Sequence, residues 1–241
     1  MGAARVASSP PSSRPELTSA FAANLERVHS TIEENAIRVG RDPGEISLVA
    51  VTKTVPASVV REAIASGLRT LGENRVQEAL PKMEEIGEGQ AEWHLIGHLQ
   101  RNKVRFIEGR FAMVQSVDSV ELVEALDHRL QRALDVLIEV NVGEEPQKTG
   151  ALPPALDVIA RAVTASTRLR LKGLMTIAPQ GSDPEAARPV FRRLAGMRTD
   201  LAQRLGMSLP VLSMGMTEDY GVAVEEGSSM LRLGRALFGP R

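Results

Sequence analysis

The stretch SLVAVT, residues 47–52, is a short apolar run rich in β-branched residues, and it leads directly into Lys53. Such a run predicts a parallel strand that is covered on both faces. Seven more runs of this kind follow, separated by segments with helical spacing. They are residues 69–72 (RTLG), 92–96 (EWHLI), 112–117 (AMVQSV), 136–142 (VLIEVNV), 169–177 (LRLKGLMTI), 210–213 (PVLS) and 230–233 (MLRL).

Strands that alternate regularly with helices predict a closed parallel barrel. We therefore expect an α/β protein whose single (β/α)8 TIM barrel fills residues 16–241. A doubly wound open sheet is the alternative, but such sheets usually have fewer strands, and no G-x-G-x-x-G motif follows the first run. The length of 241 residues suits one barrel domain, since barrels of about 250 residues are common.

The N-terminal part of the chain has a different composition. Residues 1–15, MGAARVASSPPSSRP, are rich in Ser, Pro and Ala and have no apolar segment, so we expect a disordered tail and a cytoplasmic protein. A short organellar transit peptide is the alternative, because this tail has two arginines and no acidic residue. Residues 16–39 predict an extra amphipathic helix that ends at Gly40. Its apolar residues lie at spacings of three and four: Leu17, Phe21, Leu25, Val28 and Ile32.

The composition excludes several classes of protein. The net charge is −1, which does not indicate a nucleic-acid-binding protein. Cysteine is absent, so disulfides and thiolate metal sites are excluded, and the absence fits a reducing compartment. No run approaches the roughly 18 apolar residues of a membrane helix. We expect a monomer without a membrane or nucleic-acid partner.

Lys53 is the first candidate for a reactive group. In barrels of this class the active site lies at the C-terminal ends of the strands, and Lys53 directly follows the first one. Surroundings of low dielectric there would lower the pKa of its amine and free it to attack a carbonyl. The alternative is a lysine that reaches out of the barrel mouth into solvent. The other lysines have ordinary explanations: Lys82 and Lys103 in solvent-facing helical stretches, Lys148 on a mobile loop and Lys172 near the bottom of the barrel.

The ends of the seventh and eighth runs predict a phosphate site. Gly215 and Gly234 would let backbone N–H groups approach an anion, and Ser213 and Thr217 add hydroxyl groups. Residues 217–219 (TED) are expected to open a helix whose N-terminus favours an anion. The alternative is a plain strand–turn–helix cap with Thr217 as the N-cap.

Four further polar residues lie within the runs or at their ends. Arg232 is expected to point into the barrel, where a buried arginine needs an acceptor. Its partner is either Glu139, inside the fifth run, or the ring nitrogen of a ligand, which an arginine cation would keep unprotonated. His94 and His98 flank the end of the third run without an acidic third ligand at suitable spacing, so no metal site is expected.

Six motifs occur in order between about residue 20 and the C-terminus. They are AVTKTVP at 50–56, LGENRVQE at 71–78, EWHLIGHLQRNK at 92–103, RLKGLMTI at 170–177, LSMGMTEDY at 212–220 and MLRLGRALFG at 230–239. These motifs resemble those of the YggS/PROSC family, the pyridoxal phosphate homeostasis proteins. That family has an alanine racemase N-terminal domain-like barrel, so the resemblance implies the same fold here.

The resemblance also implies a role for each matched residue. Lys53 matches the lysine that holds pyridoxal 5′-phosphate (PLP) as a Schiff base, Asn74 matches a residue that lines the cofactor pocket, and Arg232 matches the arginine that faces the pyridine nitrogen. The phosphate cradle is matched by Ser213, Gly215, Gly234 and Arg235. Relatives often have Ser or Thr in place of Arg235, so a hydroxyl contact is lost, and whether the guanidinium replaces it is open.

The implied function is control of free vitamin B6, with PLP-dependent apoenzymes as recipients of PLP. Two features favour a PLP carrier or regulator without turnover. No second domain is expected, and the single tyrosine, Tyr220, is expected beside the phosphate site. An arginine cation at the pyridine nitrogen would also weaken PLP as an electron sink. The alternatives are a racemase-like PLP enzyme that acts on amino acids and a barrel lyase that binds a sugar substrate through Lys53.

Overall fold

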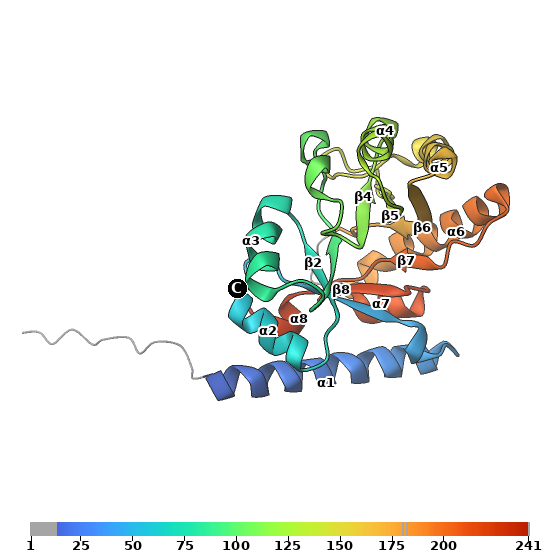
Figure 1. Cartoon of the computed structure of the whole chain (residues 1–241). Helices are drawn as coiled ribbons and strands as arrows, with labels where there is room; N and C mark the ends of the chain where they lie inside the picture. Colours follow the sequence, from blue (N-terminus) through green and yellow to red (C-terminus); the bar gives the residue numbers. More distant parts are fainter. Residues whose placement is uncertain (1–13, 180, 182, 241) are drawn as a thin grey trace, which may run out of the picture.

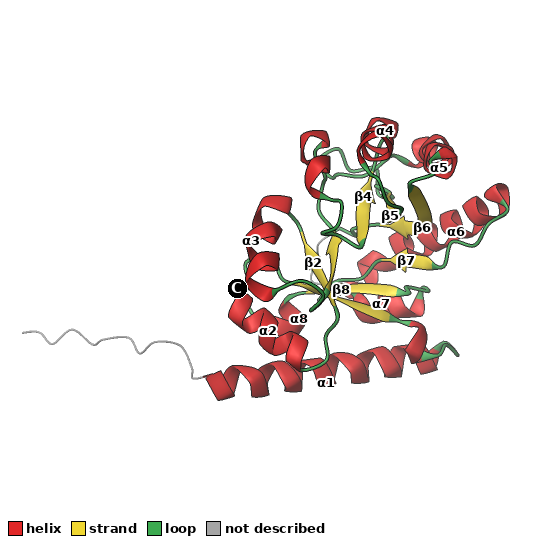
Figure 2. Ribbon diagram, in the orientation of Figure 1, coloured by secondary structure: helices red, strands yellow, loops and turns green. Residues whose placement is uncertain are grey.

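The structure, a computed structural model, describes residues 14–179, 181 and 183–240. Its eight strands pair in parallel in chain order and close into a barrel through the pairing of β1 with β8, which confirms the predicted TIM barrel (Figures 1 and 2). The strands are β1 Ser47–Val51, β2 Thr70–Glu73, β3 Glu92–Leu95, β4 Met113–Val117, β5 Leu134–Glu139, β6 Leu169–Met175, β7 Val211–Ser213 and β8 Met230–Leu233.

Helices connect the strands and surround the barrel (Figure 2). The α-helices are α1 Arg14–Arg38, α2 Ala57–Ala65, α3 Val76–Ile86, α4 Val120–Arg129, α5 Leu156–Ala165, α6 Arg188–Leu205, α7 Tyr220–Glu225 and α8 Arg235–Phe238. The 3-10 helices are η1 Pro43–Glu45, η2 Arg101–Phe106, η3 Pro153–Ala155 and η4 Pro184–Ala187. Within the described part of the chain, no helix is both long and apolar enough to cross a membrane.

The side chains of the strands alternate between two apolar layers. The inner layer fills the barrel with Val49, Val51, Ile96, Met113, Leu137, Met175 and Met230. The outer layer joins the strands to the helices and includes Ala50 of β1. Along the first strand, Val49 and Val51 therefore face the barrel interior, whereas Ala50 and the following Thr52 face the surrounding helices.

The extra N-terminal helix packs along the outside of the barrel against α7 and α8 (Figure 1). The rings of Phe21 and Phe238 lie 5.5 Å apart between their centroids, and the amide of Asn24 donates to the carbonyl of Leu237 at 3.0 Å. α1 therefore supports the short helix that follows β8.

Several predicted boundaries differ from the structure by one to three residues, among them those of β5 and α1. β5 begins at Leu134 and ends at Glu139, because the chain then turns so that Asn141 pairs with Ala151, with 2.9 Å between the Asn141 nitrogen and the Ala151 oxygen. α1 begins at Arg14, inside the predicted tail. Residues 1–13, the rest of that tail, lie outside the described residues.

Candidate functional site

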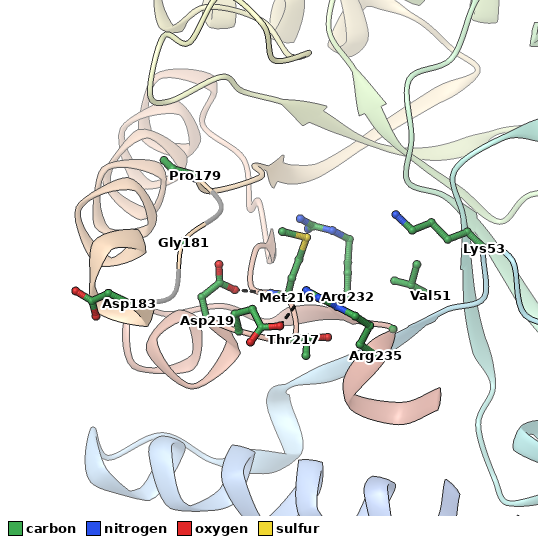
Figure 3. A pocket seen from close by; sticks show the side chains of 12 residues that line it. Val51, Lys53, Pro179, Gly181, Asp183, Met216, Thr217, Asp219, Arg232 and Arg235 are labelled. Carbon is green, nitrogen blue, oxygen red and sulfur yellow. Dashed lines mark hydrogen bonds and ion pairs between the residues drawn. The ribbon is translucent and has the colours of Figure 1, made fainter. Parts of the chain in front are cut away.

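A pocket of about 590 Å³ opens at the C-terminal ends of β1, β7 and β8, and this volume suits a small ligand. In Figure 3, Lys53 lies on one side of this pocket, Arg232 in the centre and Asp219 on the opposite side. The functional face of a TIM barrel is this same end of the strands. Of the residues predicted for the site, Lys53, Arg232, Gly234 and Arg235 line the pocket, whereas Asn74, Ser213 and Gly215 do not.

Lys53 lies at the rim of the pocket, two residues beyond the end of β1. Its side chain points into the pocket, toward Arg232 (Figure 3). Val51, two residues earlier in the chain, belongs to the inner apolar layer. Lys53 is nevertheless exposed. The expectation of low-dielectric surroundings is therefore wrong for this structure, and solvent reaches the amine.

Arg232 is a buried cation at the centre of the pocket. Its guanidinium donates to the Ser213 hydroxyl at 2.6 Å and to the Thr176 carbonyl at 2.7 Å. Burial lowers the pKa of Arg232 to about 10, against the opposing effects of the Glu139 and Asp219 carboxylates, so the side chain is charged at neutral pH. Glu139 is not its hydrogen-bonding partner, because the guanidinium bonds go to Ser213 and Thr176. The Glu139 carboxylate instead accepts from the Thr149 hydroxyl at 2.7 Å.

A chain of hydrogen bonds behind Arg232 fixes its position. Ser213 accepts from Arg232 and donates to the Gln115 side-chain oxygen at 2.7 Å. The Gln115 amide nitrogen lies 2.9 Å from His94 Nδ1. Burial lowers the pKa of His94 to about 4, so His94 is neutral at pH 7. Its Nδ1 accepts, because the amide nitrogen of Gln115 can only donate. The direction of every bond in the chain is thereby set, and the Ser213 hydroxyl has no remaining proton for a ligand.

The two histidines have separate partners. His94 bonds to Gln115 inside the barrel, whereas Nδ1 of His98 lies 3.2 Å from the Asp118 carboxylate near the barrel mouth. They therefore do not converge on one point.

The corner after β7 and β8, where the sequence predicts a phosphate cradle, is lined by residues of both loops. Thr217, Glu218, Gly234 and Arg235 line the pocket. Among the described residues, no acceptor bonds to the backbone N–H groups of these four positions. The Thr217 hydroxyl accepts from the Ala236 nitrogen at 3.2 Å, which joins the two strand ends. An oxyanion in this corner would meet N–H donors from both sides.

Gly215 shapes this corner without lining it. Its φ is +96°, and a Cβ at this position would lie 2.6 Å from the Ala223 Cβ. Glycine is therefore required for α7 to pack closely behind the loop. α7 begins at Tyr220 with Asp219 as its N-cap residue, so the expectation that residues 217–219 open the helix, and its alternative with Thr217 as the cap, are both wrong.

Asp219 is a charged pocket residue that was not predicted for the site. Its carboxylate accepts from the Met216 nitrogen at 2.6 Å and closes the loop before α7. Burial raises the pKa of the Asp219 carboxyl. The sequence does not mark this contact, because the carboxylate accepts from a residue three positions earlier and does not cap α7.

The two remaining predicted residues have other surroundings. The Arg235 guanidinium pairs with Glu218 at 2.9 Å, and both side chains are more than half exposed. Asn74 presses its backbone against Gly97, where a Cβ would lie 2.3 Å from the Asn74 oxygen. Glycine at position 97 therefore lets the ends of β2 and β3 approach closely, and Asn74 is not among the residues that line the pocket.

Lys82 overturns its sequence-based interpretation. It was expected to face solvent, but its side chain is only 11% exposed. Its ammonium donates to the Glu73 carboxylate at 2.5 Å and to the Thr52 carbonyl at 2.6 Å. The spacing contained the signal, because Lys82 follows the buried Ala79 by three residues and precedes the buried Ile86 by four.

The alanine racemase N-terminal domain family matches residues 18–241 of this chain. A pyridoxal phosphate homeostasis protein of Aquifex aeolicus is 41% identical over 220 residues, which cover 90% of this chain and 96% of that protein. The solved structure of PipY from Synechococcus elongatus, with PLP bound, has a TM-score of 0.80 and 34% identity, and the match covers 91% of this chain and 100% of PipY.

A more distant likeness concerns the barrel alone. Alanine racemase of Corynebacterium glutamicum matches with a TM-score of 0.70 at 17% identity, over 93% of this chain and 62% of that chain. The close relatives, in contrast, match along almost their whole length. This chain therefore belongs to the family of the pyridoxal phosphate homeostasis proteins, built on the alanine racemase N-terminal domain.

Proposed function

We propose that this chain binds PLP as a Schiff base on Lys53 and serves in intracellular PLP homeostasis, without efficient turnover of an amino acid. One observation carries the proposal: an exposed lysine amine, a buried arginine cation and two backbone loops with unbonded N–H groups border one pocket of about 590 Å³. These groups match the three functional parts of PLP, namely its aldehyde, its ring nitrogen and its phosphate.

Each part of the pocket has a distinct task in this proposal. The Lys53 amine would hold PLP covalently, and the aldehyde of PLP would supply the carbon for that bond. Arg232 lies at the pocket floor as a donor, and a cation there favours an unprotonated ring nitrogen. The N–H groups of Thr217, Glu218, Gly234 and Arg235 would hold the phosphate.

Two observations favour a carrier over an enzyme. The charged Arg232 weakens the ring as an electron sink. The single tyrosine, Tyr220, begins α7 and does not line the pocket, so it is poorly placed as an acid or base for an α-proton. A racemase-like PLP enzyme acting on amino acids is the second candidate, and its support is the shared barrel.

Titration of the purified protein with PLP tests the binding proposal. A Schiff base gives an absorbance band near the edge of the visible range that disappears on reduction with borohydride. Lys53→Ala should lose this band and keep its fold, because an exposed rim lysine contributes little to the core. A Lys53→Ala protein with an undiminished band would contradict it.

Incubation of the holoprotein with a panel of amino acids in deuterated water tests the lack of turnover. We expect no rapid α-deuteration. Rapid and stereospecific deuteration of one amino acid would favour the racemase-like enzyme. Delivery of PLP to apoenzymes, a monomeric state and a cytoplasmic location also belong to this proposal. Transfer assays with a PLP-dependent apoenzyme and light scattering would address the first two.

A further inference from the structure

The turn that carries Lys53 has an unusual backbone. Thr52 accepts a hydrogen bond at its carbonyl from the Val55 nitrogen at 2.9 Å, which closes a four-residue turn. In this turn Thr54 has a φ of +63°. A β-branched residue rarely adopts that conformation, and glycine or asparagine usually occupies it. Strain of this kind persists only where neighbouring groups hold the backbone in place.

A buried cluster of three side chains provides that hold. The Lys82 ammonium donates to the Thr52 carbonyl at 2.6 Å and to Glu73 Oε1 at 2.5 Å. The Thr52 hydroxyl donates to the same Glu73 oxygen at 2.6 Å. None of the three residues lines the pocket, because they lie on the helix-facing side of β1 and β2. The cluster therefore binds the peptide group that joins Thr52 to Lys53 from the side that faces the helices.

Stability alone does not account for this cluster. The Glu73 side chain is fully buried, and its Oε2 has no hydrogen-bond partner within the described part of the chain. A buried ion pair with an unsatisfied oxygen costs desolvation energy, and well-packed apolar residues often do as well or better. What the cluster achieves is local geometry, since it adds a second hydrogen bond to the one carbonyl that precedes Lys53.

We propose that Lys82 and Glu73 are positioning residues for Lys53. They hold the strained Thr52–Val55 turn so that the Lys53 amine is presented inside the pocket, and they do so without touching PLP. This inference rests on the proposed attachment of PLP to Lys53. Loss of this clamp, the cluster of Lys82, Glu73 and Thr52, lets the turn relax. The Lys53 amine then spends less time where the aldehyde of bound PLP lies. The equilibrium constant for Schiff-base formation falls, whereas the phosphate corner, formed by the loops after β7 and β8, is unaffected.

The test compares Lys82→Met with a matched lysine control. Lys172→Met removes a lysine that is 37% exposed and lies 3.8 Å from Asp135, far from the turn. PLP is added to each folded protein, and the rate and extent of the absorbance band are recorded. We expect Lys82→Met to lower the Schiff-base equilibrium constant about tenfold, equivalent to ~1.4 kcal/mol. Lys172→Met should equal the unmodified protein, and Lys82→Arg should restore part of the loss.

Further variants separate positioning from simple structural support. Lys82→Met with Glu73→Gln leaves no buried charge, so it provides the same comparison if Lys82→Met alone does not fold. Adding Thr54→Gly to Lys82→Met removes the strain and should recover part of the Schiff base.

Two results would be read differently. If the clamp variants fold and form the Schiff base at the normal rate and extent, the cluster has only a packing role and the inference is wrong. If the unmodified protein shows no borohydride-sensitive band, the proposed function itself fails, whatever the clamp variants do.

Discussion

At the scale of single residues, Arg232 is buried and yet remains charged at neutral pH. Its hydrogen bonds go to a hydroxyl and a carbonyl, both neutral groups. The carboxylates of Glu139 and Asp219 act on it through space and offset part of the cost of burial. These bonds fix the orientation of the guanidinium, because its partners belong to β7 and to the segment after β6.

Ser213→Ala tests whether this serine orients Arg232 or binds phosphate. The change leaves one guanidinium nitrogen and the Gln115 oxygen without partners, so the free energy of unfolding should fall by about 1–3 kcal/mol. The ratio of the Kd for pyridoxal to the Kd for PLP reports the phosphate contribution, and it should change by less than about twofold. Urea unfolding and fluorescence titration measure both quantities. A selective loss of PLP affinity, beyond that of the pocket variant Thr217→Val, would show that Ser213 binds the phosphate.

Arg235→Ser tests the residue that departs from the family pattern. The guanidinium is exposed and pairs with Glu218, and such surface pairs contribute little. We expect Arg235→Ser to bind PLP with an affinity within about tenfold of the original, ~1.4 kcal/mol, because the backbone N–H remains. Glu218→Gln is the matched control. A larger loss confined to Arg235→Ser would mean that the guanidinium itself holds the phosphate.

At the scale of elements, the strands were predictable and the polar pairs between them were not. The β-branched runs and their helical spacers predicted the strands because both patterns are local. Gln115 and His94 lie in apolar runs on β4 and β3, and the sequence shows only that each needs a partner. Which partner depends on the register of the closed barrel, which brings Ser213 of β7 to Gln115. The burial of Lys82 could be inferred from its spacing along α3, but its partners could not, since they lie on other elements.

The pH dependence of stability should report the chain that links β3, β4, β7 and β8. Unfolded His94 takes up a proton near pH 6.5, whereas the folded side chain does so only near about 4. Unfolding therefore binds a proton between these values, and the free energy of unfolding should fall by up to ~3 kcal/mol as the pH drops from 6.5 to 4.

His94→Asn provides the comparison for this pH effect, because it can keep an acceptor for Gln115 and does not titrate. Its stability should fall less steeply over the same range in urea unfolding. The raised pKa values of Glu139 and Asp219 act in the opposite direction in both proteins, so the difference isolates His94. Equal slopes would contradict a buried neutral histidine.

At the scale of the whole molecule, α1 covers the outside of the barrel beside α7 and α8. Arg38 pairs with Glu225 at 2.6 Å, and Arg188 of α6 pairs with the same glutamate at 2.7 Å. Helices from both ends of the sequence are thus joined through Glu225 of α7. The extra helix was predictable from its apolar spacing, but its docking site was not, because the contacts join residues more than 180 positions apart.

Truncation separates the tail from the helix. Deletion of residues 1–13 should leave both the melting temperature and the PLP content unchanged, since the predicted tail is polar and α1 begins at Arg14. Phe21→Ala should instead lower the free energy of unfolding by about 3 kcal/mol, because it empties a buried aromatic contact with Phe238. Calorimetry of both variants measures this. A large loss on deletion of residues 1–13 would show that the tail packs on the barrel.

The most direct test of the whole account is the site of PLP attachment. The protein is loaded with PLP, reduced with borohydride, digested and mapped by mass spectrometry. Five lysines compete for the label, and Lys53 is the one that lines the pocket with Arg232. We predict a single phosphopyridoxyl group on Lys53. A group on Lys82, Lys148 or any other lysine would contradict the account, because those side chains lie outside the pocket that holds the arginine and the phosphate corner.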